Sequence, residues 1–193
     1  MSKATFAVTV LTLLAACGKS GASDSVERPS ERTYAQQAVK LFHTACVGTG
    51  ANEAKLSAWA EQAKLLELDE QQKRQFNFEP EAKRAWGIHS AEGGRFFLVS
   101  GKAYCSVKAK IADQAIVERE MKVLVEQVAD SMGLSTHLIK EGVLPNVPTA
   151  KRTVYALEKQ GSPSGMMLSV YTDSSPEAGA QAGLNLRFIG SGQ

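Results

Sequence analysis

Residues 86–109 read WGIHSAEGGRFFLVSGKAYCSVKA and contain three short apolar runs. Turn-forming residues separate the runs at Glu92-Gly93-Gly94 and at Gly101-Lys102, as in β-hairpins. In the third run, Cys105 and its alternate neighbours are apolar, while the residues between them are polar. Successive side chains of a strand point to opposite faces, so this pattern predicts an antiparallel meander with Cys105 pointing inward.

Helical periodicity flanks the meander on both sides. Upstream, apolar residues from Tyr34 to Ala45 share one helical face, and a second helix is expected from about Asn52. Thr33 and Gln36 have the spacing of a capping box at the start of the first helix. Downstream, residues 113–132 give the strongest helical pattern. Its apolar positions are Met121, Leu124, Val125, Val128 and Met132, and Gly133 follows as a stop signal.

The rest of the chain predicts connections and further strands. Residues 69–84 are expected to form a short helical piece and a loop, and a proline-containing loop is expected around Pro145 and Pro148. Strands are expected near 153–157, 166–171 and 184–188, with a mobile loop at 173–183. The predicted fold class is α+β: two N-terminal helices, an antiparallel three-strand meander, a long helix and further antiparallel strands.

The first residues have the layout of a secretory signal peptide. Lys3 precedes an uncharged stretch from Ala4 to Ala16, which is shorter than the roughly 20 residues that a helix needs to cross a membrane. We therefore expect residues 1–16 to be a signal peptide. Residues 17–31 are expected to form a flexible tether, and residues 32–193 a single domain.

Leu14-Ala15-Ala16-Cys17 resembles the lipobox of bacterial lipoproteins. The resemblance implies cleavage before Cys17, diacylglycerol on its thiol, and acyl chains such as palmitate that hold the protein on a membrane. It also implies a location in the bacterial cell envelope, facing the periplasm. Gly18 permits sorting to the outer membrane, whereas Lys19-Ser20 resembles an inner-membrane retention pattern, so both membranes stay open. The alternative is an ordinary secretory peptide in which Cys17 has no role.

The mature domain resembles an uncharacterised group of small secreted or lipid-anchored proteobacterial proteins. The features that carry this resemblance are Phe42 and Cys46, Trp86, Cys105-Ser106-Val107 and the C-terminal strand pairs. It implies a similar fold and no particular activity.

Two cysteines remain once Cys17 is assigned to lipid. In an oxidising compartment, this even remainder favours a disulfide between Cys46 and Cys105. The alternative makes Cys105 the nucleophile of a cysteine hydrolase of cell-wall peptides, with His137 or His89 as its base. A nucleophile inside a predicted strand lacks the usual activation, so the disulfide is the preferred interpretation.

Other chemistry has little support in the sequence. His43 and Cys46 have a spacing that suits one edge of a metal site, but no second pair of ligands follows, and neither a metal nor a cofactor is expected. The 22 basic residues nearly balance the 20 acidic ones, so nucleic acid is not an expected partner. Trp59, Trp86 and Met166-Met167 are interpreted as core. The sequence thus favours a non-catalytic, lipid-anchored module that binds an envelope protein, a lipid or a wall component through its sheet or loops.

Replacing the lipobox cysteine tests the predicted anchor. We expect Cys17→Ser to yield an uncleaved, unlipidated precursor, because the lipid is attached through the thiol. Metabolic labelling with a radioactive fatty acid and gel mobility provide the measurement. Labelled fatty acid on the Cys17→Ser protein would contradict the prediction.

Overall fold

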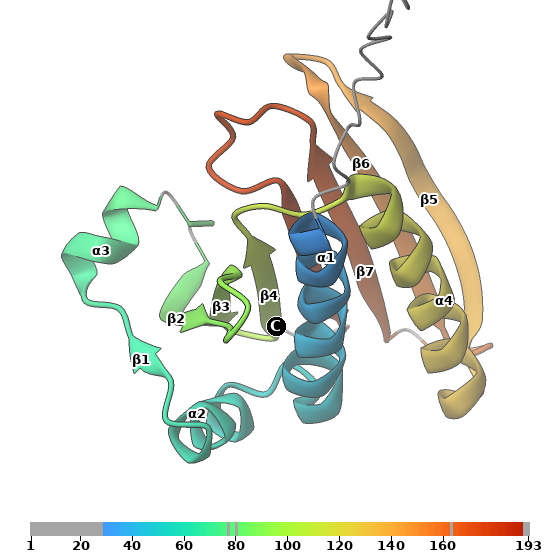
Figure 1. The fold of residues 1–193 in the computed structure, drawn as a ribbon. Coiled ribbons are helices and arrows are strands. Elements are labelled where there is room, and N and C mark those ends of the chain that lie inside the picture. The colour runs from blue at the N-terminus through green and yellow to red at the C-terminus, as the bar shows by residue number, and fades with distance from the viewer. Residues whose placement is uncertain (1–28, 77, 80, 163, 191–193) are drawn as a thin grey trace, which may run out of the picture.

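The computed structural model describes residues 29–76, 78–79, 81–162 and 164–190 (Figure 1). Its helices are α1 (Pro29–Leu41), the π-helical turn η1 (Phe42–Val47), α2 (Glu53–Gln62), α3 (Glu70–Gln75) and α4 (Gln114–Met132). Its strands are β1 (Leu66–Glu67), β2 (Ala82–His89), β3 (Arg95–Gly101), β4 (Tyr104–Ala109), β5 (Ser135–Leu144), β6 (Val147–Glu158), β7 (Gly165–Asp173) and β8 (Ala182–Ile189).

The eight strands of the described residues join in one antiparallel sheet with the order β1-β2-β3-β4-β8-β7-β6-β5. The predicted α+β class is therefore confirmed. The predicted meander is also confirmed, since β2, β3 and β4 are consecutive neighbours and Cys105 is fully buried. The order of elements differs in detail from the prediction. The sequence did not predict β1 or β5 as strands, and it predicted only a short helical piece and a loop where α3 lies.

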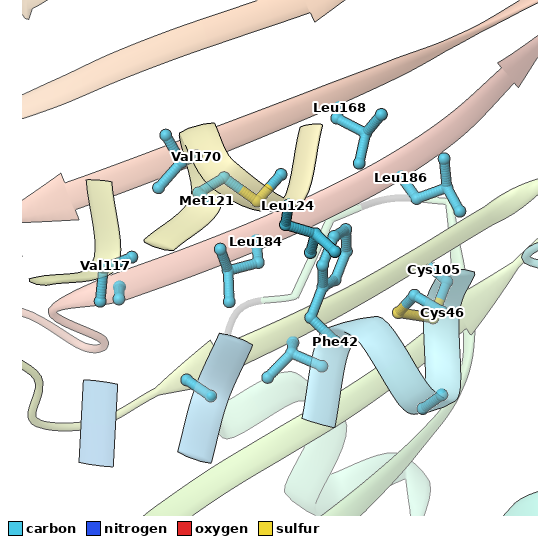
Figure 2. Packing of buried hydrophobic residues seen from close by; sticks show 14 of the residues in the cluster. Phe42, Cys46, Cys105, Val117, Met121, Leu124, Leu168, Val170, Leu184 and Leu186 are labelled. Carbon is cyan, nitrogen blue, oxygen red and sulfur yellow. A yellow bond between two sulfur atoms is a disulfide. The ribbon is translucent and has the colours of Figure 1, made fainter. Parts of the chain in front are cut away.

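One face of the sheet carries the main core. Helices α1 and α4 lie side by side across this face (Figure 1), and we call it the inner face. Phe42 of η1 is completely buried, and Figure 2 shows it among side chains from α4 and the sheet. The labelled neighbours are Val117, Met121, Leu124, Leu168, Val170, Leu184 and Leu186.

Helices α2 and α4 are capped at residues where the sequence predicts helix ends. The side chain of Asp113 accepts a hydrogen bond from the N–H of Ile116 at 3.0 Å and begins α4. Gly133 ends α4 with φ of 64°, a left-handed conformation that glycine adopts without steric cost. Asn52 caps α2 by accepting from the N–H of Lys55 at 3.0 Å. The predicted start of α2 and both predicted ends of α4 are confirmed. Helix α2 ends at Gln62, so Leu66, which was expected on its apolar side, lies instead in β1.

The first helix begins earlier than predicted. Helix α1 starts at Pro29, so residues 29–31 are helical and do not belong to the expected tether, and Thr33 lies inside the helix rather than at its cap. Proline is well suited to the first turn of a helix, where its missing N–H is not needed. The apolar periodicity starts only at Tyr34, which is why it did not reveal the first turn.

The expected loop around Pro145 and Pro148 is instead the end of a long β-hairpin formed by β5 and β6. Strand β5 is an edge strand whose side chains are almost all exposed, so it lacks the alternation that marks a half-buried strand. Leu138 and Ile139 are adjacent, and the register shifts between Leu138 and Lys140. This irregularity breaks the period of two by which a strand is recognised in a sequence.

Cys46 of η1 and Cys105 of β4 form a disulfide with their Cα atoms 5.4 Å apart (Figure 2). Both residues are fully buried in the inner-face core. The cysteine pair that the sequence favoured therefore lies together, and it joins the N-terminal helical unit to a strand in the middle of the sheet.

The predicted signal peptide, Cys17 and residues 17–28 of the predicted tether lie outside the described residues. Within the described part of the chain, no helix is long and apolar enough to cross a membrane.

Loss of the disulfide should destabilise the domain strongly. Its sequence separation of 59 residues corresponds to about 4 kcal/mol in the chain-entropy estimate. We expect Cys46→Ala and Cys105→Ala each to lower the Tm by about 10 °C, and the double variant by a similar amount, because all three remove one cross-link. Thermal unfolding followed by circular dichroism provides the measurement.

Alkylation supplies the independent check. The protein is unfolded in urea without a reductant, because both cysteines are buried in the native domain. It is then treated with a thiol reagent, and peptide mass spectrometry maps the modified cysteines. Modification of both Cys46 and Cys105 before reduction would show that the pair is open.

Candidate functional site

The second face of the sheet, which we call the outer face, lies opposite α1 and α4. Strand β4 shows how the two faces differ: Cys105 and Val107 pack in the main core, whereas Tyr104 belongs to a separate, smaller apolar cluster. By the alternation of a strand, Ser106 and Lys108 share the outer face with Tyr104. The outer face is thus more polar than the inner face and forms our candidate site.

The segment between β1 and β2 crosses part of the outer face. Helix α3 begins with a capping box in which the side chains of Asp69 and Gln72 each bond the other residue's backbone N–H. After α3, the ring centroids of Phe76 and Phe78 lie 4.3 and 5.6 Å from that of Phe97 on β3. Three aromatic rings therefore hold this segment against the sheet.

Charged groups fasten the end of the same segment. The carboxylate of Glu79 lies 3.0 Å from the ammonium of Lys108, and that of Glu81 lies 2.9 Å from the guanidinium of Arg187. Gly101 permits the close approach, because a Cβ there would lie 2.3 Å from the carbonyl oxygen of Glu81. A side chain at residue 101 would push the segment away from the sheet.

Three neighbouring hollows lie along this face and share walls. The central hollow, of about 360 Å³, shares Glu79, Tyr171 and Asn185 with a hollow of about 400 Å³ beside β6. It shares Phe76, Phe97 and Gly179 with a third, of about 540 Å³, beneath α3. We call them the central, β6 and α3 hollows, and together the outer groove. Volumes of this size are typical of small-molecule sites.

A polar network crosses the floor of the groove. The hydroxyl of Tyr104 donates to Oδ1 of Asn185 at 3.2 Å, and Nδ2 of Asn185 donates to the hydroxyl of Ser169 at 3.3 Å. These residues lie on the adjacent strands β4, β8 and β7. Burial and the nearby carboxylate of Glu79 raise the pKa of Tyr104 well above its ordinary value. Tyr104 therefore stays protonated and acts as a neutral hydrogen-bonding group.

The β6 hollow also presents a cation. Arg152 lies across from Tyr171 on β7 and from Gly142 on β5, and its side chain is exposed. Within the described ranges, no carboxylate pairs with Arg152. The rest of this wall is partly apolar, with Val154 and Met167. This end of the groove can therefore contact an acidic group beside carbon-rich surface.

The loop after β7 is fixed to the groove. Asp173 accepts from the hydroxyl of Tyr171 at 2.8 Å and from the N–H of Ser175 at 2.9 Å, and Lys110 donates to the carbonyl of Ala178 at 2.6 Å. Burial raises the pKa of Asp173, but the hydrogen bonds that its carboxylate accepts from Ser175 and Tyr171 outweigh burial and leave the pKa below its ordinary value. Burial and the hydrogen bond to Asp173 raise the pKa of Tyr171 to about 12. The connection predicted as a mobile loop is thus held by specific bonds.

The residues singled out by sequence do not meet in this groove. Cys46 and Cys105 lie on the inner face in their disulfide, and Cys17 lies outside the described residues. His43, His89 and His137 are exposed on η1, β2 and β5. His89 lines the α3 hollow, whereas His43 lines a separate pocket formed by α1, η1 and α4, outside the outer groove. In the described portion, no group of three His, Cys, Asp or Glu side chains has metal-binding geometry.

The sequence pattern did not reveal the outer groove. Its polar residues on β4 and β8 alternate with core residues, as in Tyr104, Lys108 and Asn185. The same alternation is typical of any strand with one solvated face, so the pattern alone does not mark a site. The phenylalanines of the 69–81 segment were the available signal, because Phe76 and Phe78 stand out in an otherwise polar stretch.

Comparisons with protein-family models, with curated proteins and with solved structures found no match to this chain.

The Asp173 contacts predict how stability depends on pH. A carboxyl whose pKa is lowered by folding stabilises the protein above its unfolded pKa of about 3.9, and this contribution is lost as the pH falls through the folded value. We expect Asp173→Asn to lower the free energy of unfolding at pH 7. The deficit relative to wild type should shrink below pH 4. Urea unfolding at pH 7, 5, 4 and 3 measures it.

Asp130→Asn serves as the matched control, because Asp130 is an exposed carboxylate on α4, away from the groove. Its free energy of unfolding should remain within about 0.5 kcal/mol of wild type at pH 7. An Asp173→Asn deficit that stays constant down to pH 3 would contradict the assigned role of the carboxylate.

Proposed function

We propose that this chain is a lipid-anchored protein of the bacterial cell envelope, and that its outer groove binds an envelope component without chemical turnover. The observation that carries the proposal is the groove: three hollows with shared walls on a sheet face that α1 and α4 leave free. The lipobox-like residues 14–17 support the anchor and the periplasm-facing location.

The groove offers recognition chemistry. Its floor contains neutral hydrogen-bonding groups in Tyr104, Asn185 and Ser169, and its walls contain aromatic rings and the guanidinium of Arg152. A few convergent polar groups among apolar walls are the usual composition of a binding site. The adjacent hollows suit a ligand longer than any one of them.

The placement of the cysteines supports a non-catalytic role. A cysteine hydrolase needs a free thiolate next to a base. Here the sulfur of Cys105 is bonded to that of Cys46, and the residue is fully buried. The imidazoles of His89 and His137 are exposed on strands at opposite sides of the sheet order. No specific observation favours the hydrolase alternative.

Site-specific cross-linking in living cells tests the proposal. A photoreactive amino acid replaces one exposed or half-exposed residue at a time in the full chain: Met167 in the β6 hollow, Ala180 in the central hollow or Gln75 in the α3 hollow. We expect at least one of these positions to give a specific adduct with an envelope component, because these side chains line the groove.

Val123 on α4 and Leu138 on β5 are the matched controls, since both are exposed apolar residues outside the groove. Equal adducts at groove and control positions, or adducts at control positions alone, would overturn the proposed groove. In a second experiment, the unmodified protein is incubated with cell-wall peptides. Release of fragments that stops in a folded Cys105→Ser variant would favour the hydrolase instead.

A further inference from the structure

The α3 hollow has a carbon-rich lining. Leu66, Leu68, Phe76, Phe97 and backbone or side-chain atoms of Ile88 and Phe96 surround about 540 Å³. Leu68 lies beside Gly87, where a Cβ would be 3.4 Å from the Cδ2 atom of the leucine. The hollow lies between α3 and the β2–β3 hairpin.

Two large apolar side chains of this hollow are poorly covered. Leu66 is 71% exposed and Phe76 is 45% exposed. Both line the same hollow, so their exposed carbon surface is contiguous with its interior. Exposed apolar surface that leads into a cavity is characteristic of a site that another molecule covers.

The charged side chains that line the α3 hollow have one sign. Among the described residues, its lining contains Arg95 and Lys110, together with the imidazole of His89, and no Asp or Glu. Arg95 and His89 are register partners at the end of the β2–β3 hairpin. No ion pair of Arg95 occurs within the described residues. The central hollow, by contrast, has Glu79 and Asp173 in its lining.

From this arrangement we propose that the α3 hollow binds a single-chain anionic amphiphile, a long-chain fatty acid carboxylate. The acyl chain would lie among Leu66, Leu68 and Phe76, and the carboxylate would face Arg95. This inference deepens the proposed function by naming a ligand class for one end of the groove.

The pairing of β1 argues for such a ligand over a peptide. One way in which an extended peptide binds is by adding a strand to a free sheet edge. Here β1 covers part of the edge of β2, with Leu66 opposite Gly87 and the N–H of Leu68 donating to the carbonyl of Ala85 at 2.8 Å. Strand β1 is now the edge, and its two residues offer little backbone for a further strand. An acyl chain has no backbone groups to satisfy, so it needs only the apolar walls.

The test is photo-cross-linking of the full chain in phosphatidylcholine nanodiscs with a 16-carbon fatty acid that carries a diazirine in its chain. Peptide mass spectrometry locates the adducts. We expect them within residues 66–76 and 87–97, which contain most of the lining. Adducts confined to other segments would overturn the inference.

Substituted variants distinguish binding in the α3 hollow from general adsorption to the protein surface. Leu66→Glu places a charge in the apolar wall at an exposed position, and we expect the adduct yield to fall about tenfold, equivalent to about 1.4 kcal/mol. Leu138→Glu is the matched control, because Leu138 is 56% exposed on β5 at the other side of the sheet. Near-UV circular dichroism verifies the fold of both. An equal loss in both variants, or no loss in Leu66→Glu, would overturn the inference.

A separate experiment tests the contact between the carboxylate head group and Arg95. Arg95→Gln should weaken labelling by the fatty acid more than labelling by the corresponding fatty alcohol, because only the acid carries a negative charge. Lys102→Gln, an exposed cation at the opposite end of β3, is the control. The same effect of Arg95→Gln on acid and alcohol would refute the carboxylate contact.

The result is also distinguishable from that of the proposed function. If the fatty acid gives no adduct while a photoreactive residue at position 75 captures a protein, the amphiphile inference fails and the binding groove stands. If neither experiment gives an adduct at the groove, both proposals fail.

Discussion

The alternation of side chains along β4 divides the molecule into a core side and a groove side. Cys105 and Val107 point toward the helices, and Tyr104 and Lys108 point away from them. A shift of this strand by one residue would exchange the two sets, since the period of a strand is two. The lysine would then enter the core and the disulfide partner would leave it. The register of β4 against β3 and β8 therefore fixes both faces at once.

The elements best predicted from sequence are those whose burial is one-sided. Helix α4 has one apolar face against the sheet, with a cap at Asp113 and a stop at Gly133, and each of these signals is local. The meander was recognisable from local signals of another kind: its turns are short and rich in glycine, and they separate short apolar runs. The pairing of Cys46 with Cys105 followed from counting cysteines rather than from geometry.

The elements that the sequence did not reveal depend on contacts between distant residues. Strand β5 is exposed along its length, so no apolar alternation marks it, and its pairing with β6 defines it. The outer groove arises because Phe76 and Phe78 pack on Phe97 and because Glu79 and Glu81 reach cations on β4 and β8. These contacts join residues whose positions in the chain carry no shared periodicity, and no local propensity encodes them.

The disulfide also determines how the domain would carry mechanical load. A pull between the start of α1 and the end of β8 travels along α1 to Cys46 and then crosses directly to Cys105. The intervening chain, with a sequence separation of 59 residues, lies off this path. At about 3.4 Å per residue, roughly 200 Å of chain is therefore unable to extend while the disulfide is intact. While the bond is intact, the helices and strands of this part of the chain, α2, α3, β2 and β3, would thus remain unstretched. The groove walls that they form would be shielded from tension applied at either end of the domain.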